Sequence, residues 1–397
     1  MTMKKFMSIV MSRRTGFVLF VLTFFCFCVV VFDSRNRIIE YRSQSIISEE
    51  NRSIKIQNIV DQRRRDIKHE MENYEFPNGK FCRNISNLDD LLMEKGGRPM
   101  RSFLIAGWRT GSSFTSAIIN SHPANFYLDE PLQDFGHVRI RGPLLVDAAI
   151  KNIHKFFNCE FDKLQHFIDF VKPDQWVYND NQGLWPHCVN QRDLCSDPIF
   201  LTAVCRLYPL QQMKFTRLPL ESAQLLLEDK HLGARMILLV RDPRGIMQSR
   251  GRLEWCQNST DCSDPQVLCN DMVSDHKVAV ELKKKYPHTF KVVRYEDLSL
   301  NPQHKAKEMF EFYGLNFHSN VEKFLDTHTK NNLGDSYSLF RDSKKAPFHW
   351  RNDLNFSEVE EIQRVCSTAM KLWGYVLAVN ETHQKEFNPI VYNYRRF

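Results

Sequence analysis

The chain has 397 residues, of which 43% are hydrophobic and 25% are charged. This composition is typical of a folded protein with one large core or two smaller ones, and it excludes a chain that is disordered throughout. The formal net charge of +7 is modest beside 54 Lys and Arg residues, so no nucleic-acid partner is expected. A basic groove for an anionic ligand is the simpler interpretation of the excess charge.

The N-terminal region contains the only long apolar stretch, residues 16–32, which follows four basic residues. Its length is near the lower limit of about 17 residues for a membrane-spanning helix. A cleaved signal peptide is the alternative, but no A-x-A-like cleavage site follows the stretch. We therefore predict a cytoplasmic tail at residues 1–14, a transmembrane signal anchor at residues 15–32 and a luminal location for the rest of the chain.

Nine of the eleven cysteines follow the predicted anchor, where an oxidising lumen would favour disulfide bonds. Because nine is an odd number, at least one of them is free or bonded to another chain. Cys188 and Cys195 could close a short loop, and so could two among Cys256, Cys262 and Cys269, but the pairing stays open. No C-x-x-C occurs and the histidines are scattered, so no metal is expected.

Residues 33–98 are rich in charge and lack sustained apolar periodicity, which predicts a luminal stem. Five N-x-[ST] sequons along the chain agree with glycosylation in such a compartment. The predicted glycosylation sites are Asn51, Asn84, Asn258, Asn355 and Asn380.

Short apolar runs alternate with helical stretches from residue 99 to residue 397. The runs are residues 103–106, 126–128, 212–215, 236–240 and 290–293. Strands separated by helices predict an α/β domain in which a parallel sheet is flanked by helices.

The first run leads into a loop with the sequence Gly107-Trp-Arg-Thr-Gly-Ser-Ser113 and then into a helix. A buried parallel strand followed by a helix N-terminus presents unpaired N–H groups, which suit an anion. A triphosphate-binding loop needs G-x-x-x-x-G-K-[ST], whose Lys is missing here. Arg109 supplies the charge instead, so the loop can hold a phosphate but lacks the usual ATPase or GTPase groups.

A second such segment follows the run at residues 236–240, where Arg241-Asp-Pro turns the chain into a helix. Arg241 stands where a metal-binding Asp would end the strand in a triphosphate-hydrolysing enzyme. Ser249 lies eight residues after Arg241, about two helical turns, so both side chains can face one pocket. Two anion sites suit a nucleotide with phosphates at both ends.

In these motifs the chain resembles the Golgi carbohydrate sulfotransferases. Within this family it resembles the group that sulfates the 6-hydroxyl of galactose, N-acetylglucosamine or N-acetylgalactosamine. Residues 109–113 resemble the 5′-phosphosulfate loop of that family, and residues 241–250 resemble its 3′-phosphate segment. Further matches are residues 210–217, 293–298, 349–351, Cys366 and 373–375.

The resemblance implies the P-loop-like sulfotransferase fold and 3′-phosphoadenosine 5′-phosphosulfate (PAPS) as co-substrate, with no metal. The predicted partners are a glycan or proteoglycan acceptor, the Golgi membrane through one helix, and a second copy of the chain in a homodimer. Two rival functions stay open: a non-catalytic nucleotide- or glycan-binding relative, and a nucleotide-dependent kinase.

The predicted donor-binding residues are Arg109, Thr110, Gly111, Ser112, Ser113, Arg241, Ser249, Trp350 and Arg351. Lys214 and Arg217 are candidates for contact with the sulfate or the acceptor. The alternatives are a solvent-facing Ser249, a Lys214 at a sheet edge and a Trp350 that only packs.

Catalysis requires a proton acceptor for the attacking sugar hydroxyl and positive charge around the moving sulfuryl group. Glu130 is the predicted base, because Glu130 follows the strand at residues 126–128 and ligands bind at the carboxyl ends of such strands. Arg109 is the second predicted catalytic residue. Related sulfotransferases place a catalytic Glu at the same point. Asp129 is the near rival and His122 a weaker one. The loops at residues 133–143 and 176–195 are expected to read the sugar.

Overall fold

The computed structural model describes residues 3–76, 84–334 and 337–391, and the chain divides into two compact units, residues 1–62 and 63–397. Helix α1 (Met3–Glu70) contains the predicted anchor, although the side chains of residues 1–23 lie outside the described part. Within the described ranges, no helix is long and apolar enough to cross a membrane. The anchor therefore stays a prediction.

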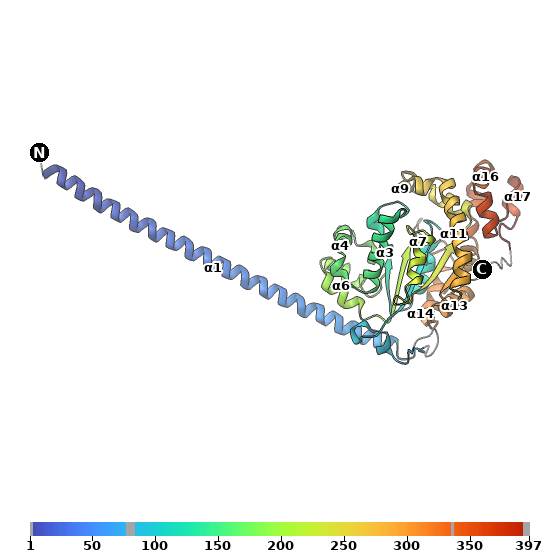
Figure 1. Ribbon diagram of the computed structural model, residues 1–397, viewed down its shortest axis with the longest axis horizontal. Coiled ribbons are helices and arrows are strands. Elements are labelled where there is room, and N and C mark those ends of the chain that lie inside the picture. The colour runs from blue at the N-terminus through green and yellow to red at the C-terminus, as the bar shows by residue number, and fades with distance from the viewer. Residues whose placement is uncertain (1–2, 77–83, 335–336, 392–397) are drawn as a thin grey trace. The chain divides into compact units, whose positions relative to one another are not determined.

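The second unit is built on a sheet of five parallel strands in the order β2-β3-β1-β4-β5. Figure 1 shows helices packed around this sheet. The strands are β1 (Met100–Ile105), β2 (Asn125–Asp129), β3 (Leu210–Phe215), β4 (Arg235–Val240) and β5 (Phe290–Arg294). Each of the five apolar runs in the sequence coincides with one strand, so the predicted parallel α/β sheet is confirmed. The runs at residues 103–106, 126–128 and 236–240 are apolar throughout because both faces of the sheet are covered.

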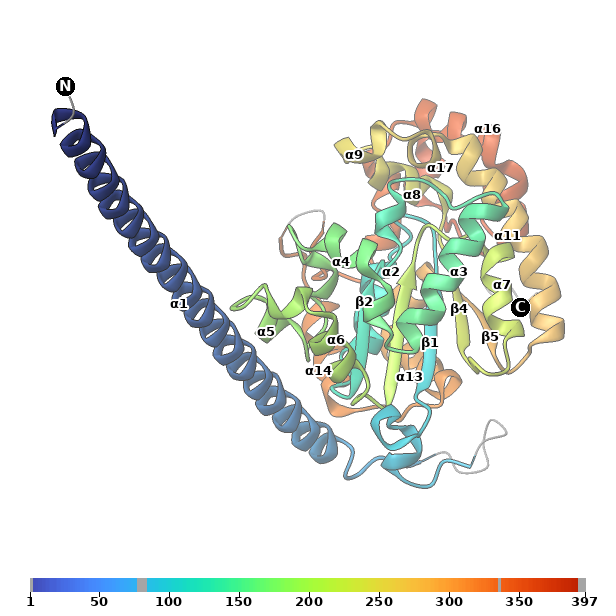
Figure 2. The same cartoon turned by 60° about the vertical axis from the view of Figure 1, so that its left-hand side comes forward.

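Helices cover both faces of the sheet (Figure 2). One face packs against α2 (Ser112–Asn120), α12 (Tyr295–Leu300), α13 (Pro302–Tyr313) and α14 (Ser319–His328). The other carries α3 (Pro143–Phe157), α7 (Leu220–Glu228) and α11 (Pro265–Lys285). Side chains alternate between the faces, so Leu104 joins the first core while Phe103 meets Phe157 of α3 on the second face.

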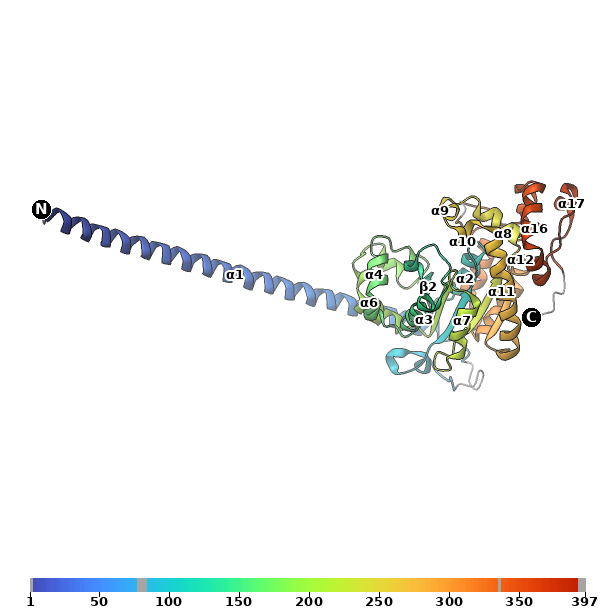
Figure 3. The same ribbon diagram turned by 45° about the horizontal axis from the view of Figure 1, so that its top comes forward.

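The remaining helices surround this layered core. They are α4 (Gln165–Val171), α5 (Trp185–Cys188), α6 (Pro198–Cys205), α8 (Pro243–Arg250), α9 (Glu254–Gln257), α10 (Thr260–Ser263), α15 (Trp350–Asp353), α16 (Phe356–Trp373) and α17 (Glu381–Glu386). Figure 3 shows α8, α11 and α16 gathered together, and these three helices contact one another.

Four disulfide bonds lie among the described residues of the second unit. Two of them, Cys188–Cys195 and Cys256–Cys262, close short loops as the spacing allowed. The other two are Cys159–Cys205 and Cys269–Cys366, and the latter ties α11 to α16. The one remaining cysteine of the nine that follow the predicted anchor is Cys82, which lies outside the described residues.

The strand order places the two predicted anion loops side by side. From β1, in the middle of the sheet, the chain first moves to β2 and β3 on one side and then crosses to β4 and β5 on the other. Ligands of open α/β sheets bind at such a switch point, outside the carboxyl ends of the strands. The loops after β1 and β4 both reach this edge.

Candidate active site

The loop after β1 is shaped by Gly111, whose φ of +88° is in the left-handed region. A Cβ atom at this position would lie 2.3 Å from Cε2 of the Tyr295 ring, so only glycine fits. No side chain in the described part of the chain caps the N-terminus of α2, which leaves its first N–H groups for an anion. Thr110 and Ser112 are buried beside it, and the Thr110 hydroxyl donates to the Gly107 carbonyl at 2.9 Å.

Arg109 connects the two motifs. Its Nε donates to the Ser249 hydroxyl at 2.9 Å, and its carbonyl oxygen accepts from Nη1 of Arg241 at 2.9 Å. Ser249 therefore faces this site and not solvent. Burial lowers the pKa of the Arg109 guanidinium, and the nearby Arg241 lowers it further. Two cations held so close together are suited to an anionic ligand.

The second motif differs from expectation at the start of α8. The Asp242 carboxylate accepts from the Arg244 N–H at 2.9 Å and so caps the helix. Asp242 thus occupies one of the N–H groups expected to bind an anion at this helix N-terminus, and the side chains of Arg241 and Ser249 remain for that role. The Arg241 guanidinium lies 4.8 Å over the Tyr295 ring, and within the described residues its buried Nε has no hydrogen-bond partner.

Glu296 holds the segment that contains Arg241 and Asp242 in place. One of its carboxylate oxygens accepts from the Asp242 N–H at 2.9 Å and the other from the Tyr375 hydroxyl at 3.0 Å. Burial raises the pKa of Glu296 to about 7, and Asp242 adds to the rise. Glu296 thus positions Asp242, and through it the residue before, Arg241.

Glu130 follows β2 with a φ of 55°, a left-handed conformation that is uncommon outside glycine. Its Oε2 accepts from Nη1 of Arg217 at 2.8 Å and from the Thr216 N–H at 3.2 Å. Its Oε1 is buried and has no hydrogen-bond partner in the described part of the chain, with Nζ of Lys214 at 4.0 Å. The carboxylate is thus fixed through Oε2, while Oε1 has no hydrogen-bond partner in the described residues.

Lys214 links this carboxylate to the first loop. Its Nζ lies 2.6 Å from Oδ1 of Asp129 and 3.3 Å from the Ser113 hydroxyl. It stands on β3, between β2 and β1, and not at a sheet edge. Burial works to lower the pKa of Lys214, but Asp129 and Glu130 raise it overall, so the ammonium stays charged.

The two rival bases lie in different surroundings. Oδ1 of Asp129 meets Lys214 and also accepts from the Tyr127 hydroxyl at 3.1 Å. His122 precedes β2, at the amino edge of the sheet, where its Nε2 is 3.2 Å from Oδ1 of Asn316. Burial lowers the pKa of His122 to about 4. The structure therefore places Asp129 beside Glu130 and His122 away from both.

Trp350 and Arg351 pack against the C-terminal part of the domain. The Arg244 guanidinium lies 4.1 Å over the buried Trp350 ring. The Arg351 guanidinium donates to the carbonyl of Gln384 at 3.0 Å and to that of Lys385. These contacts agree with the alternative in which Trp350 only packs against its neighbours. A role of Trp350 and Arg351 in donor binding stays a prediction.

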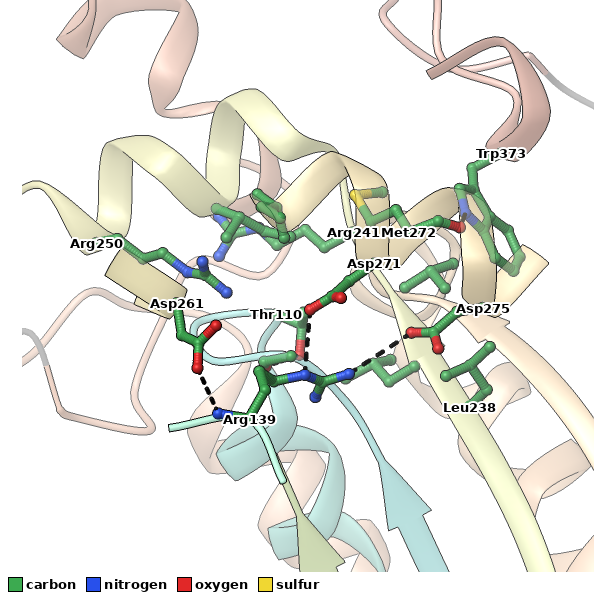
Figure 4. Close-up of a pocket in the computed structure, with 15 residues that line it drawn as sticks. Thr110, Arg139, Leu238, Arg241, Arg250, Asp261, Asp271, Met272, Asp275 and Trp373 are labelled. Atoms are coloured by element: carbon green, nitrogen blue, oxygen red, sulfur yellow. Dashed lines mark hydrogen bonds and ion pairs between the residues drawn. The ribbon is translucent and has the colours of Figure 1, made fainter. Parts of the chain in front are cut away.

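Sequence reasoning missed Arg139, which lies in the loop after Glu130. Its Nε is 3.2 Å from Asp271, its Nη2 is 4.0 Å from Asp275, and its backbone N–H donates to Asp261 at 2.7 Å (Figure 4). Burial raises the pKa of Asp275 to about 6, which Arg139 partly offsets. No local pattern signals these contacts, because the carboxylates come from α10 and α11, far along the chain.

These charges line a cavity of about 40 Å³ behind the first loop, large enough for two or three waters. Its wall also includes Thr110, Arg241 and Arg250 (Figure 4). Across the described ranges, no group of three or more His, Cys, Asp or Glu side chains could hold a metal ion. Chemistry without a metal stays a prediction.

The five sequon asparagines are exposed. The side chains of Asn355 and Asn380 cap α16 and α17 through their oxygens. Glycosylation at the five positions stays a prediction.

The chain matches the family model of the sulfotransferase domain over residues 99–374, and it therefore belongs to the sulfotransferase family. It is 26% identical over 370 residues to carbohydrate sulfotransferase 1 of Mus musculus, covering 77% of this chain and 88% of that protein. It is 28% identical over 330 residues to carbohydrate sulfotransferase 3 of Homo sapiens, covering 69% of this chain and 67% of that protein.

Among solved structures, the chain resembles the sulfotransferase domain of the Synechococcus PCC 7002 olefin synthase, with 15% identity and a TM-score of 0.38. That match covers 68% of this chain and 93% of the other. Sulfotransferase STF9 of Mycobacterium avium matches with 14% identity and a TM-score of 0.37, covering 70% of this chain and 78% of the other.

Proposed function

We propose that the protein transfers a sulfuryl group from PAPS to a sugar hydroxyl, the 6-OH of galactose, N-acetylglucosamine or N-acetylgalactosamine in a glycan or proteoglycan. The observation that carries the proposal is the chain of contacts from Ser113 through Lys214 to Glu130. It joins an anion-binding loop to a carboxylate with one oxygen that has no hydrogen-bond partner in the described residues. The similarity to two carbohydrate sulfotransferases supports a sugar acceptor.

The residues present fit such a donor. The uncapped N-terminus of α2 and the Ser113 hydroxyl would hold its 5′-phosphosulfate. Arg241, whose buried Nε has no partner in the described residues, and Ser249 would hold its 3′-phosphate, with Arg109 between them. Thr110, Gly111 and Ser112 complete the first loop.

Glu130 is the proposed base, and it accepts the proton of the sugar hydroxyl on Oε1. The sugar oxygen then forms a bond to the donor's sulfur as the bond from sulfur to the 5′-phosphate oxygen breaks. Arg217 keeps the carboxylate in place through the other oxygen, and Lys214 offsets the negative charge that moves to the leaving phosphate. No covalent bond to the protein is required.

We also propose that the protein is a single-pass Golgi membrane protein whose residues 15–32 form the anchor and whose catalytic unit is luminal. The apolar stretch at residues 16–32 and the four disulfide bonds of the second unit support an oxidising compartment behind a membrane. Protease treatment of intact microsomes should then spare everything except a short N-terminal tail, whereas digestion of the catalytic unit would contradict this arrangement. A homodimer stays a prediction.

The acceptor is tested by giving the full-length chain radiolabelled PAPS and a panel of oligosaccharides that end in each of the three sugars. Mass spectrometry of the product locates the new sulfate. We expect label on carbon 6 of at least one of these sugars. Label at another position would refute the proposed 6-OH specificity, and label on no sugar would refute the carbohydrate acceptor.

A further inference from the structure

A group of aromatic rings lies near Arg217, the residue that holds the candidate base. The rings of His137 and Trp255 are stacked, with centroids 5.0 Å apart and planes 28° apart. The indole N–H of Trp255 donates to the Tyr337 hydroxyl at 3.1 Å. We refer to His137, Trp255 and Tyr337 as the aromatic platform. Its members come from three separate parts of the chain.

The platform is joined to both halves of the proposed active site. Nε of Arg217, the residue that holds Glu130, donates to the carbonyl of Gly136, next to His137, at 2.6 Å. On the other side the Arg109 guanidinium lies 5.5 Å over the Tyr337 ring. A molecule that lay on the platform could therefore extend a hydroxyl toward Glu130.

The platform is also held rigidly. The Cys256–Cys262 disulfide closes the segment that follows Trp255, and the Ser259 hydroxyl of that segment donates to the His137 carbonyl at 2.8 Å. The Arg139 backbone N–H donates to Asp261 of the same segment at 2.7 Å. Because these contacts order the His137 and Trp255 rings before any ligand arrives, binding to these two rings would cost little conformational entropy.

The chemistry of the platform suits a sugar ring. His137 is exposed, Tyr337 is 60% exposed and Trp255 is partly exposed, so aromatic surface faces solvent. Burial and the nearby Arg217 lower the pKa of His137, which favours its neutral imidazole. A pyranose has an apolar C–H face and a rim of hydroxyls, and aromatic rings with polar edges match both features.

We propose that His137 and Trp255 form a subsite that binds the sugar next to the one that is sulfated. This inference rests on the proposed function, because the subsite is defined relative to the sugar whose hydroxyl faces Glu130. It names an extended acceptor: an oligosaccharide that reaches the platform should be preferred over a single sugar. His137 lies in the loop at residues 133–143 that was expected to read the sugar, whereas Trp255 was not predicted.

The test compares full-length wild type, Trp255→Ala and Trp255→Phe with a tetrasaccharide of alternating galactose and N-acetylglucosamine and with the corresponding monosaccharides. Calorimetry measures the affinity for the tetrasaccharide and for 3′-phosphoadenosine 5′-phosphate (PAP), and kinetics measure KM and kcat. We expect Trp255→Ala to weaken tetrasaccharide binding and raise its KM about tenfold, a loss of about 1.4 kcal/mol, with kcat within about threefold. Trp255→Phe should recover most of that loss. Monosaccharide KM and PAP affinity should not change.

Tyr286→Ala is the matched control. Tyr286 is a partly exposed aromatic residue that precedes β5, at the opposite edge of the sheet, so this variant should bind the tetrasaccharide like wild type. Unchanged tetrasaccharide affinity in Trp255→Ala would overturn the subsite. Weakened PAP affinity in that variant would overturn it too, because the platform would then bind the donor.

Failure of the proposed function has a different signature. In that case wild type would transfer no sulfate to any sugar, and the same calorimetry would still report whether the tetrasaccharide binds through Trp255. Binding that depends on Trp255 would then support a sugar site without the transfer reaction. No binding by wild type would overturn the subsite.

Discussion

Nε of Arg109 donates a hydrogen bond of 2.9 Å to the hydroxyl of Ser249, across 140 positions of the sequence. This contact joins the loop after β1 to the second turn of α8. Two motifs that the sequence presents as separate anion sites are thereby two walls of one site. One ligand with two phosphates can bridge them.

The first prediction concerns the 3′-phosphate. Arg241→Ala and Ser249→Ala should each weaken binding of PAP while leaving the affinity for 5′-AMP within about twofold. Only PAP has a 3′-phosphate, which is the group that these two side chains are proposed to contact. Loss of a charge-assisted hydrogen bond costs about 1.5–3 kcal/mol, so Arg241→Ala should reduce PAP affinity at least about tenfold. Calorimetry with both nucleotides measures this. An equal loss for both would show that these residues do not read the 3′-phosphate.

The second prediction concerns the base. Glu130→Gln should lower kcat about a hundredfold or more and leave PAP affinity nearly intact, since the amide keeps an oxygen for Arg217 but cannot accept the proton. Asp129→Asn is the matched variant. Asp129 pairs with Lys214 and not with Arg217, so loss of its charge should weaken the ion pair that holds Lys214. Near-normal turnover in Glu130→Gln would show that Glu130 is not the base and would favour Asp129 for that role.

Gly111 gives a third prediction. Gly111→Ala should cost about 1–2 kcal/mol of strain at positive φ and a further 1–3 kcal/mol of overlap with Tyr295, and it should abolish PAP binding. Gly96→Ala is the control, because Gly96 has a φ of +82° but no atom within 4 Å of the added Cβ. It should show the strain alone and bind PAP normally. Urea unfolding and PAP titration compare the two, and equal behaviour would contradict the packing of Gly111 on Tyr295.

The fourth prediction is a pH dependence of stability. Because the pKa of Glu296 is raised from 4.5 to about 7 in the fold, its contribution to stability is complete below about pH 4.5 and is lost as the pH rises through 7. Glu296→Gln does not ionise, so the free energy of unfolding of the variant minus that of wild type should increase from pH 5 to pH 8, by at most about 1.4 kcal/mol per pH unit. Urea unfolding across this range measures the difference. A constant difference would show that Glu296 does not titrate there.

The fifth prediction is that activity survives removal of metal. Lys214, Arg109 and the N–H groups of α2 provide positive charge where triphosphate enzymes use magnesium. The full-length chain should keep at least half of its activity after exhaustive chelation at constant ionic strength. Loss of more than about nine-tenths, restored by micromolar metal but not by salt, would contradict this.

The fold was largely predictable because most of its strands contain a short apolar run, which is typical of a sheet covered on both faces. Glu130 and the loop at residues 107–113 were predictable for the same reason, since their positions follow from where β1 and β2 end. The cap on α8 could have been read from Asp242-Pro243, because an Asp before a Pro at the first helical position is a common N-cap pattern.

The remaining features depend on contacts between distant segments. Arg139 meets Asp271 and Asp275 only because α11 packs beside its loop, and no spacing in the sequence announces that approach. The stacking of His137 on Trp255 likewise depends on where the Cys256–Cys262 loop folds back. Such pairs follow from tertiary packing and not from local periodicity.

The central claim is that the site carries a sulfuryl group and not a phosphoryl group from a nucleotide to a sugar. The most direct measurement gives the full-length chain PAPS labelled in its sulfate and, separately, ATP labelled in its γ-phosphate, each with the same oligosaccharide panel. We expect label from PAPS in a glycan, an equal amount of PAP formed, and no label from ATP. Label from ATP, or PAPS binding without transfer to any acceptor, would contradict the account.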